Sequence, residues 1–351
     1  MPNIFLRGME CLSDKMAKFW PQRQMKAASE EKYGIMAWTE PQGAIVDIVF
    51  IHGLRGHRER TWTVKNGSGF WPRDFLALEI PEARILTYGY DANIIRADSP
   101  ISNSRLGEHA QNFLSALATY REKGQNNERP IIFVAHSLGG LVCEDALVTS
   151  RASAEEHLKQ ISRCTRGIAF LGTPHSGTDL AASVDRIVQW IANTRQVNTR
   201  VAKVLSRDSE VLSRVQSGFH SLLESRTNEE LPKVSITCFY EELPIPRFRE
   251  VVPKSSAILP AYPAIGIHCD HRDMAKFTSP TDPGFLSVLN ELLRWINDIR
   301  SDLGEINRFA EQPREQCHGG IALGGITICG SVVQSSIVNG SQVIHGNLVF
   351  G

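Results

Sequence analysis

The stretch that decides the fold is residues 131–141, which read I-I-F-V-A-H-S-L-G-G-L. The first four residues are apolar, and a short apolar run of this kind is typical of a buried parallel strand. Apolar residues with helical spacing follow it, at Leu141, Val142, Ala146 and Leu147. The pattern therefore predicts that Ser137 lies on a sharp turn between a strand and a helix.

Small residues flank Ser137 on both sides, with Ala135 two positions before it and Gly139 two positions after it. This is the nucleophile-elbow pattern, with Ala in place of the usual first Gly. A bulky side chain at either flank would collide with the neighbouring backbone. The first N–H groups of the helix would face the serine oxygen, where negative charge would develop. The structural alternative is that Ser137 only caps the helix, as serine often does.

Composition indicates a globular protein with an ordinary balance of residues. The chain has 351 residues, of which 42% are hydrophobic and 22% are charged, enough for one large α/β domain with extensions. The formal net charge is zero, so no nucleic-acid partner is indicated. The 7 cysteines form no C-x-x-C pair, which favours free thiols in a reducing compartment over a disulfide framework or a zinc site. We find no transmembrane segment and no apolar signal core, and we therefore expect a cytoplasmic protein.

Predicted strands and helices alternate over residues 31–300, the predicted α/β-hydrolase domain. An edge strand is expected at 33–38, and buried strands at 44–51, 83–88, 131–134, 167–171, 234–240 and 264–267. Helices are expected at 106–121 and at 283 to about 300. This alternation predicts an α/β fold with a mostly parallel sheet covered by helices on both faces.

Residues 176–233 contain no obvious strand, and their apolar spacing predicts two or three helices. We interpret them as a helical cap inserted above the site. A cap can exclude water and admit an apolar chain. Passive packing is the alternative interpretation.

Three residues that could act together follow predicted strands, in the order Ser137, Glu241, His271. This is the chain order of α/β hydrolases, and it differs from the orders in chymotrypsin and subtilisin. His271 would take the serine proton and return it to the leaving group. Glu241 would hold the imidazole in the correct tautomer and stabilise its cation. Glu242 is an alternative acid, because strand ends are the least certain part of such a prediction.

A glycine-rich turn, H-G-L-R-G-H at 52–57, follows the predicted strand 44–51. In this type of fold, the second oxyanion donor is a backbone N–H from such a loop. We assign the two donors to the N–H groups of Leu54 and Leu138. The supporting residues of the two loops are His52, Gly53, His136 and Gly139.

Other ligands are disfavoured at this turn. The loop lacks both glycine patterns that bind nucleotide phosphates. No carboxylate cluster accompanies its histidines, so we expect neither a metal nor a cofactor.

Five motifs together resemble the SERAC1-like and PGAP1-like serine esterases. They are H-G-L-R-G-H-x-x-x-T-W at 52–62, A-H-S-L-G-G-L at 135–141, F-L-G-T-P-H-S-G at 170–177, F-Y-E-E at 239–242 and D-H-R-D-M-A-K-F at 270–277. The likeness runs from about Tyr33 to Arg300, and it departs from the family only in having Ala135 at the elbow. It implies an α/β-hydrolase fold, a catalytic triad of Ser137, His271 and Glu241, and acyl-ester or lipid substrates.

The end of the chain has a different composition. Residues 301–317 are mostly polar, contain Pro313 and are predicted to form a linker. Residues 318–351 contain no Asp, Glu, Lys or Arg. Their short β-prone runs are punctuated by Gly330-Ser331, Gly340-Ser341 and Gly346-Asn347. Such runs suit strands from many chains stacked in register. The alternative is a flexible Gly/Ser-rich tail.

This tail resembles the prion-like amyloid signalling motifs of fungal HET-s-type proteins and of esterase-like effectors paired with NLR receptors. The resemblance implies homotypic amyloid assembly through 318–351, templated by a receptor with a matching motif, in programmed cell death or defence. Two alternatives stay open, namely a housekeeping lipid esterase with an incidental tail and a catalytically silent amyloid adaptor. Residues 1–30, an N-terminal extension of mixed basic and apolar residues, could form an amphipathic helix with peripheral membrane contact, or a surface helix or frayed end.

Overall fold

The structure is a computed structural model, in which the chain divides into two units, Met1–Asp302 and Leu303–Gly351. It describes residues 32–65, 69–91, 103–175, 180–193, 209–245 and 250–311. The predicted N-terminal extension (1–30) and the predicted amyloid-forming tail (318–351) lie outside the described residues. All site residues discussed below belong to the first unit.

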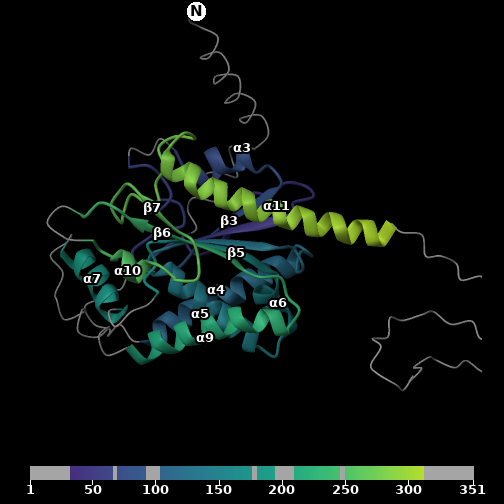
Figure 1. Cartoon of the computed structure of the whole chain (residues 1–351), viewed down its shortest axis with the longest axis horizontal. Helices are drawn as coiled ribbons and strands as arrows, with labels where there is room; N and C mark the ends of the chain where they lie inside the picture. Colours follow the sequence, from purple (N-terminus) through teal and green to yellow (C-terminus); the bar gives the residue numbers. More distant parts are fainter. Residues whose placement is uncertain are drawn as a thin grey trace, which may run out of the picture. The chain divides into compact units, whose positions relative to one another are not determined.

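A seven-stranded sheet forms the centre of the described chain (Figure 1). The strands are β1 (Gly34–Thr39), β2 (Val46–Ile51), β3 (Ala83–Gly89), β4 (Ile131–His136), β5 (Thr165–Leu171), β6 (Ser235–Glu241) and β7 (Ala264–Ile267). Their spatial order is β1-β3-β2-β4-β5-β6-β7, and only β1 is antiparallel to its neighbour. All seven predicted strands are therefore present, with ends that shift by a residue or two. For example, β4 extends to His136 because the turn begins only at Ser137.

Helices cover both faces of this sheet (Figure 1). The helical elements are η1 (Pro72–Leu76), α3 (Ala77–Glu79), α4 (Asn103–Lys123), α5 (Gly139–Ala152), α6 (Glu156–Cys164), α7 (Leu180–Asn193), α9 (Ser209–Asn228), α10 (Lys254–Ala257) and α11 (Pro283–Glu311). Helices α4, α5, α6 and α9 lie on one face, and α11 lies on the other. Trp295 of α11 packs on Gly167 of β5, where a Cβ atom would come within 2.4 Å of the indole. The layered arrangement and the strand order are those of an α/β hydrolase, so the predicted fold is confirmed.

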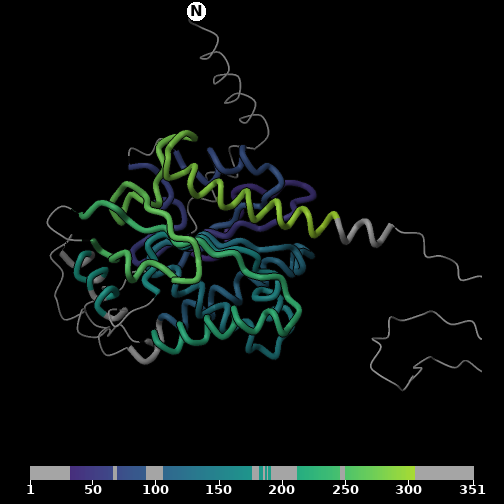
Figure 2. The backbone as a smooth tube through the Cα atoms, viewed as in Figure 1, coloured from purple at the N-terminus to yellow at the C-terminus, as the bar shows by residue number. Residues whose placement is uncertain are grey.

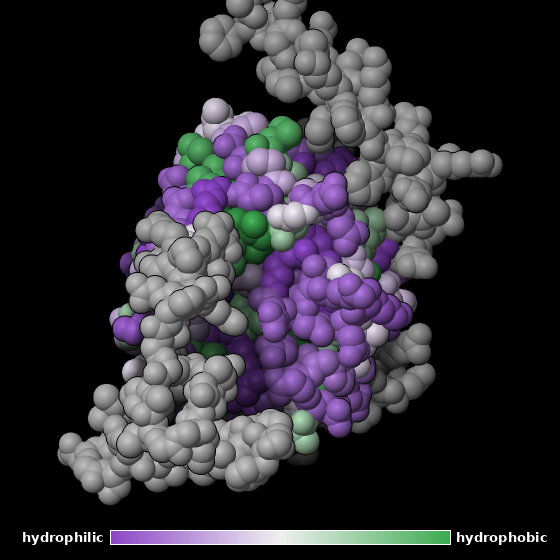
Figure 3. Space-filling view, turned by 90° about the vertical axis from the view of Figure 1, so that its right-hand side faces the viewer, coloured by the Kyte–Doolittle hydropathy of each residue, from purple (hydrophilic) through white to green (hydrophobic). Residues whose placement is uncertain are grey.

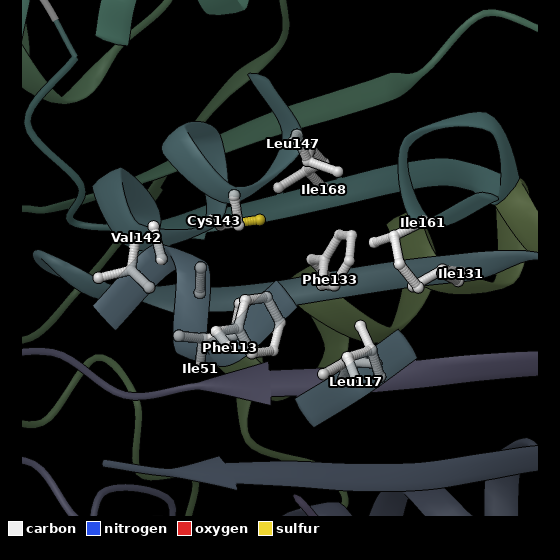
Figure 4. Close-up of a cluster of buried hydrophobic side chains, with 14 of the residues drawn as sticks. Ile51, Phe113, Leu117, Ile131, Phe133, Val142, Cys143, Leu147, Ile161 and Ile168 are labelled. Carbon is white, nitrogen blue, oxygen red and sulfur yellow. The ribbon is translucent and has the colours of Figure 1, made fainter. Parts of the chain in front are cut away.

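The main hydrophobic core lies between the sheet and helices α4, α5 and α6 (Figure 4). Its labelled members are at most 2% exposed, and they are Ile51, Phe113, Leu117, Ile131, Phe133, Val142, Cys143, Leu147, Ile161 and Ile168. Each large apolar side chain buried in this way contributes about 1.5–3 kcal/mol to folding. Every residue of β2 and β4 is buried, which explains why the sequence of these strands reads as a nearly continuous apolar run. The face viewed in Figure 3 is, by contrast, mainly hydrophilic over its coloured part.

One buried charge interrupts that apolar run, namely Asp47 at the beginning of β2. Arg84 holds its carboxylate with two hydrogen bonds, of 2.8 Å from Nε and 2.7 Å from Nη2. Arg129 donates at 3.0 Å, and Arg121 also donates to the same group. The three guanidinium groups replace water as hydrogen-bond partners of the buried carboxylate and compensate its negative charge. The cluster joins β2, β3 and the chain before β4 at the amino ends of the strands.

The predicted helical cap comprises residues 176–233, of which the structure describes 180–193 and 209–233. Helices α7 and α9 lie within residues 176–233, where we expected helices and no strand, while 176–179 and 194–208 lie outside the described residues. Helix α9 packs along α5, as the chain trace shows (Figure 2), and its Phe219 and Leu222 belong to the main core. Only Leu212, near its beginning, joins the apolar cluster beside the site. Most of α9 therefore belongs to the body of the domain, because its apolar residues are buried against α5.

The last helix is longer than predicted. We expected it to end at about Arg300, before a linker at 301–317, but α11 continues to Glu311. Pro313 is the first proline after the start of the helix, so no residue that breaks helices strongly stops it earlier. The rest of the predicted linker lies outside the described residues.

Candidate active site

Ser137 lies in a strained turn between β4 and α5. Its φ angle is 55°, in the left-handed region that residues other than glycine seldom adopt. The predicted steric requirement of the turn is visible at Gly139, where a Cβ atom would lie 2.5 Å from the carbonyl oxygen of His52. The loop after β2 approaches equally closely, since a Cβ atom on Gly53 would lie 2.7 Å from that of Ser137. Small residues at these positions therefore let the two loops meet at the serine.

The structure brings the three predicted site residues into one chain of hydrogen bonds. Nε2 of His271 lies 3.0 Å from Oγ of Ser137, and Nδ1 of His271 lies 2.7 Å from Oε2 of Glu241. The three residues are at most 3% exposed. Ser137 and His271 follow β4 and β7, and Glu241 is the last residue of β6, so all three lie at the carboxyl ends of parallel strands, at the same edge of the sheet. This arrangement can remove the serine proton and stabilise the imidazolium that results.

The carboxylate of Glu241 is held on its other side by backbone. Its Oε1 accepts hydrogen bonds from the N–H groups of Val251 and Val252, the second at 3.2 Å. Glu242, the alternative acid, instead lies 3.2 Å from Nδ1 of the exposed His268 and does not contact His271. Successive side chains of a strand point to opposite faces of the sheet, which explains why only one of the two glutamates reaches the imidazole.

The two assigned oxyanion donors belong to the loops that meet at Ser137. Leu138 is the N-cap residue of α5, and Leu54 lies in a turn closed by a 3.0 Å bond from the Gly56 N–H to the Gly53 carbonyl. Among the loop and turn hydrogen bonds of the described residues, neither the Leu54 nor the Leu138 N–H donates to backbone.

The two loop histidines are buried and neutral. Burial lowers the pKa of His52 to about 4 and that of His136 to about 3. His52 stacks on Tyr90 with ring centroids 4.4 Å apart, and the Tyr90 hydroxyl donates to its carbonyl at 2.8 Å. Nε2–H of His136 donates to the carbonyl of His271 at 2.9 Å. These histidines therefore support the loops. No group of side chains that could hold a metal ion occurs in the part of the chain described.

Sequence reasoning missed Trp190, which the cap contributes to the site. Its indole meets the His271 ring edge-on, with centroids 5.8 Å apart and planes at 84°. The indole N–H is buried, and it has no hydrogen-bond partner among the described residues. Trp190 also packs against an apolar cluster, whose members include Leu138, Leu141, Val184, Ile187, Leu212, Val251 and Val252. The helical spacing of Val184 and Ile187 was visible in the sequence, but it gave no indication that Trp190, one turn further on, would meet His271.

Sequence reasoning also missed a buried ion pair behind the elbow. Nδ1 of His175 lies 2.7 Å from Oε1 of Glu144, and both residues are fully buried. The F-L-G-T-P-H-S-G motif contains His175, but nothing in it indicates a partner on α5.

No helix in the described residues is long and apolar enough to cross a bilayer.

No family model matches the chain. It is similar to protein SERAC1 of Danio rerio, with 29% identity over 253 residues that cover 66% of this chain and 36% of the relative. The corresponding human protein is 28% identical over 247 residues, with the same coverage. The chain thus matches little more than a third of the length of these relatives.

Solved structures with a similar layout include esterase B from Lactobacillus rhamnosis, which is 11% identical and has a TM-score of 0.41. This likeness covers 87% of this chain and 100% of that one. The NocB thioesterase domain is 15% identical with a TM-score of 0.37, over 75% of this chain and 99% of that domain. The chain therefore has the α/β-hydrolase fold, and its sequence is similar to a part of SERAC1.

Proposed function

We propose that this protein is a serine esterase that hydrolyses acyl esters through Ser137, His271 and Glu241. The observation that carries the proposal is the unbroken chain of hydrogen bonds from Oγ of Ser137 through His271 to Glu241, with distances of 3.0 and 2.7 Å. A serine hydroxyl needs an adjacent base to become a nucleophile, and a base needs an orienting group to hold its tautomer. Both requirements are met in one buried site.

The proposed reaction has two halves. Oγ of Ser137 attacks the ester carbonyl while Nε2 of His271 takes the hydroxyl proton, and the N–H groups of Leu54 and Leu138 bind the resulting oxyanion. The C–O bond to the alcohol then breaks, and His271 returns the proton to the leaving oxygen. Water next attacks the acyl-Ser137 ester with His271 as base, which releases the carboxylic acid and restores the serine.

The site's surroundings favour a lipid-like acyl group. The apolar cluster beside Leu138 combines residues of the elbow helix with Val184 and Ile187 of α7 and with Val251. An acyl chain placed there would leave water, at a gain of about 0.8 kcal/mol for each methylene buried. The unpartnered indole N–H of Trp190 could donate to a polar oxygen of the substrate.

The wider role that we propose rests on the sequence of the tail. Residues 318–351 lack Asp, Glu, Lys and Arg and carry three glycine-punctuated β-prone runs. We propose that they assemble as amyloid, templated by an NLR-type receptor, and recruit a cytoplasmic esterase to cell death or defence, in contact with a membrane surface when it is active. The housekeeping esterase and the silent adaptor are the competing roles.

A fluorophosphonate probe tests the enzymatic proposal, because it reacts only with an activated serine. We expect the probe to label the full chain at Ser137 and to leave the Ser137→Ala variant unlabelled. Comparison of the products that the two proteins release from a lipid extract would then identify the acyl group and the alcohol. Absence of labelling in both the free and the assembled protein would favour the adaptor. Absence of thioflavin-positive fibres from a 318–351 peptide would favour the housekeeping esterase.

A further inference from the structure

A second buried charge cluster lies outside the proposed triad. Glu144 of α5 contacts His175, in the segment after β5, at 2.7 Å. Its other oxygen, Oε2, accepts a hydrogen bond of 2.5 Å from Nε2 of Gln216 of α9. Glu144 and His175 are fully buried, and Gln216 is 8% exposed. Burial of a carboxylate is costly unless it is paired, so this group requires a partner of opposite charge.

The segment that carries His175 is attached directly to the nucleophile turn. Oγ1 of Thr173 donates to the backbone carbonyl of Ser137 at 3.0 Å. The same threonine packs against the first turn of α5, because a Cβ atom on Gly140 would lie 2.2 Å from its Oγ1. Any displacement of this segment would therefore reach the residue that carries the nucleophile.

The segment is also connected to the residues that hold the acid. The backbone N–H of His175 donates to the carbonyl of Ser256, in α10, at 2.7 Å. Helix α10 begins two residues after Val252, and the N–H groups of Val251 and Val252 bind Oε1 of Glu241. His175 thus lies between the nucleophile turn and the support of Glu241, and Glu144 ties it to α5.

The charge state of this pair follows from its surroundings. Burial by itself lowers the pKa of the His175 imidazole. The adjacent Glu144 carboxylate and the Cys238 thiol raise this pKa by more than burial lowers it, to about 9. Glu144 and Cys238 are the titratable groups that face the ring. The Phe170 ring meets the imidazole edge to face, with ring centroids 4.4 Å apart. The carboxylate at 2.7 Å therefore favours the protonated imidazole of an ion pair, whereas burial favours the neutral rings of His52 and His136.

We propose that Glu144 and His175 form a buried ion pair whose role is to position Ser137 and the segment that supports Glu241. The two are positioning residues and do not touch the substrate. Their effect on turnover rests on the esterase function proposed above, whereas the charged state and its effect on the Ser137 turn do not.

The first experiment needs no enzymatic activity. Nitrogen-15 NMR of the histidine side chains in the full chain, assigned with the His175→Gln variant, reports whether each ring is protonated. We expect the His175 ring to carry both protons at neutral pH and to titrate near pH 9. In Glu144→Gln we expect it to be neutral, and the backbone amide signals of Ser137 and Leu138 to move. A neutral His175 in the unmodified protein would overturn the proposal.

The second experiment measures turnover of a short-chain nitrophenyl ester. We expect Glu144→Gln to lower kcat by about a hundredfold, because small displacements of reacting groups have effects of this size, while KM changes little. Arg151→Gln is the matched control, since Arg151 of α5 also forms an ion pair, of 2.9 Å, with Glu229 directly after α9, but on the exposed surface. We expect this control to keep kcat within about twofold.

Equal losses of kcat in the two variants, or no loss in Glu144→Gln, would overturn the positioning role. An inactive unmodified protein would instead count against the proposed esterase function. In that case, the NMR signals of His175 and of the Ser137 turn in Glu144→Gln and Arg151→Gln still decide the proposal made here.

Discussion

His271 and Glu241 are joined by a 2.7 Å bond between Nδ1 and Oε2, and the second oxygen of the same carboxylate is bound by backbone N–H groups. This double attachment leaves the carboxylate little freedom to rotate away from the imidazole. The carboxylate is thus fixed in position before any substrate arrives.

Replacement of the acid should distinguish the two neighbouring glutamates. We expect Glu241→Gln to lower kcat by about a thousandfold or more, since an amide cannot stabilise the imidazolium in the same way. Glu242→Gln is the control, because the Glu242 carboxylate pairs with the exposed His268, and we expect its kcat to stay within about twofold. Steady-state kinetics on a soluble ester checks both. A comparable loss in the two variants would contradict the assignment of Glu241.

The close approach of the two loops predicts a steric effect at Gly139. We expect Gly139→Ala to destabilise the protein by about 1–3 kcal/mol, because its Cβ atom would meet the carbonyl of His52 at 2.5 Å. Urea unfolding followed by circular dichroism measures this change. Gly43→Ala is a useful comparison, since a Cβ atom there meets nothing within 4 Å and any loss comes from its positive φ alone. Unchanged stability and activity in Gly139→Ala would show that the elbow relaxes.

The cap is expected to influence chain-length preference through Trp190. We expect Trp190→Ala to lower kcat/KM for an octanoate ester about tenfold more than for an acetate ester, which corresponds to the loss of roughly two buried methylenes. Gln189→Ala serves as control, because Gln189 is exposed on the same helix. Hydrolysis rates across a series of nitrophenyl esters supply the data. Equal losses for short and long chains would instead indicate that Trp190 acts only through His271.

The buried cluster at the other end of the strands predicts an effect on stability. We expect Asp47→Asn to cost about 3–5 kcal/mol, because it leaves Arg84, Arg121 and Arg129 without their shared carboxylate. Glu156→Gln, which breaks the exposed pair with Arg163, should change stability by less than about 0.5 kcal/mol. Urea titrations of both variants provide the comparison. A small loss in Asp47→Asn would mean that water enters the cluster.

The buried histidines predict a maximum of stability between acid and alkaline pH. The folded pKa of His175 lies above its ordinary value of 6.5, so its contribution is complete below pH 6.5 and is lost as the pH rises through about 9. The folded pKa values of His52 and His136 lie below 6.5, so their contribution is present above pH 6.5 and is lost as the pH falls towards about 4 and 3. Unfolding free energies measured across this range should show both slopes, and His175→Gln should remove the alkaline one.

The sequence predicted best those features that depend on residues close together in the chain. The apolar run at 131–134 and the small residues around Ser137 were sufficient to predict β4, the elbow and α5. A buried strand and a tight turn each require particular residue types at adjacent positions, and these can be recognised in the sequence. The end of α11 was predicted too early, because the prediction relied on the charged composition after residue 300, and such a composition alone does not stop a helix. Helix α6 was not predicted, because Leu158 and Ile161 are too few apolar residues to establish a period.

The amino-acid sequence by itself determined the strand–serine–helix turn, the chain order of Ser137, Glu241 and His271, and the alternation that makes a mostly parallel sheet. Tertiary structure alone decided that Glu241 and not Glu242 meets His271, that Trp190 lies against the same ring, and that Glu144 pairs with His175. The physical reason is distance along the chain. Each of these contacts joins residues that are remote in sequence, and their approach depends on how the sheet and its helices pack, which no local pattern of residues encodes.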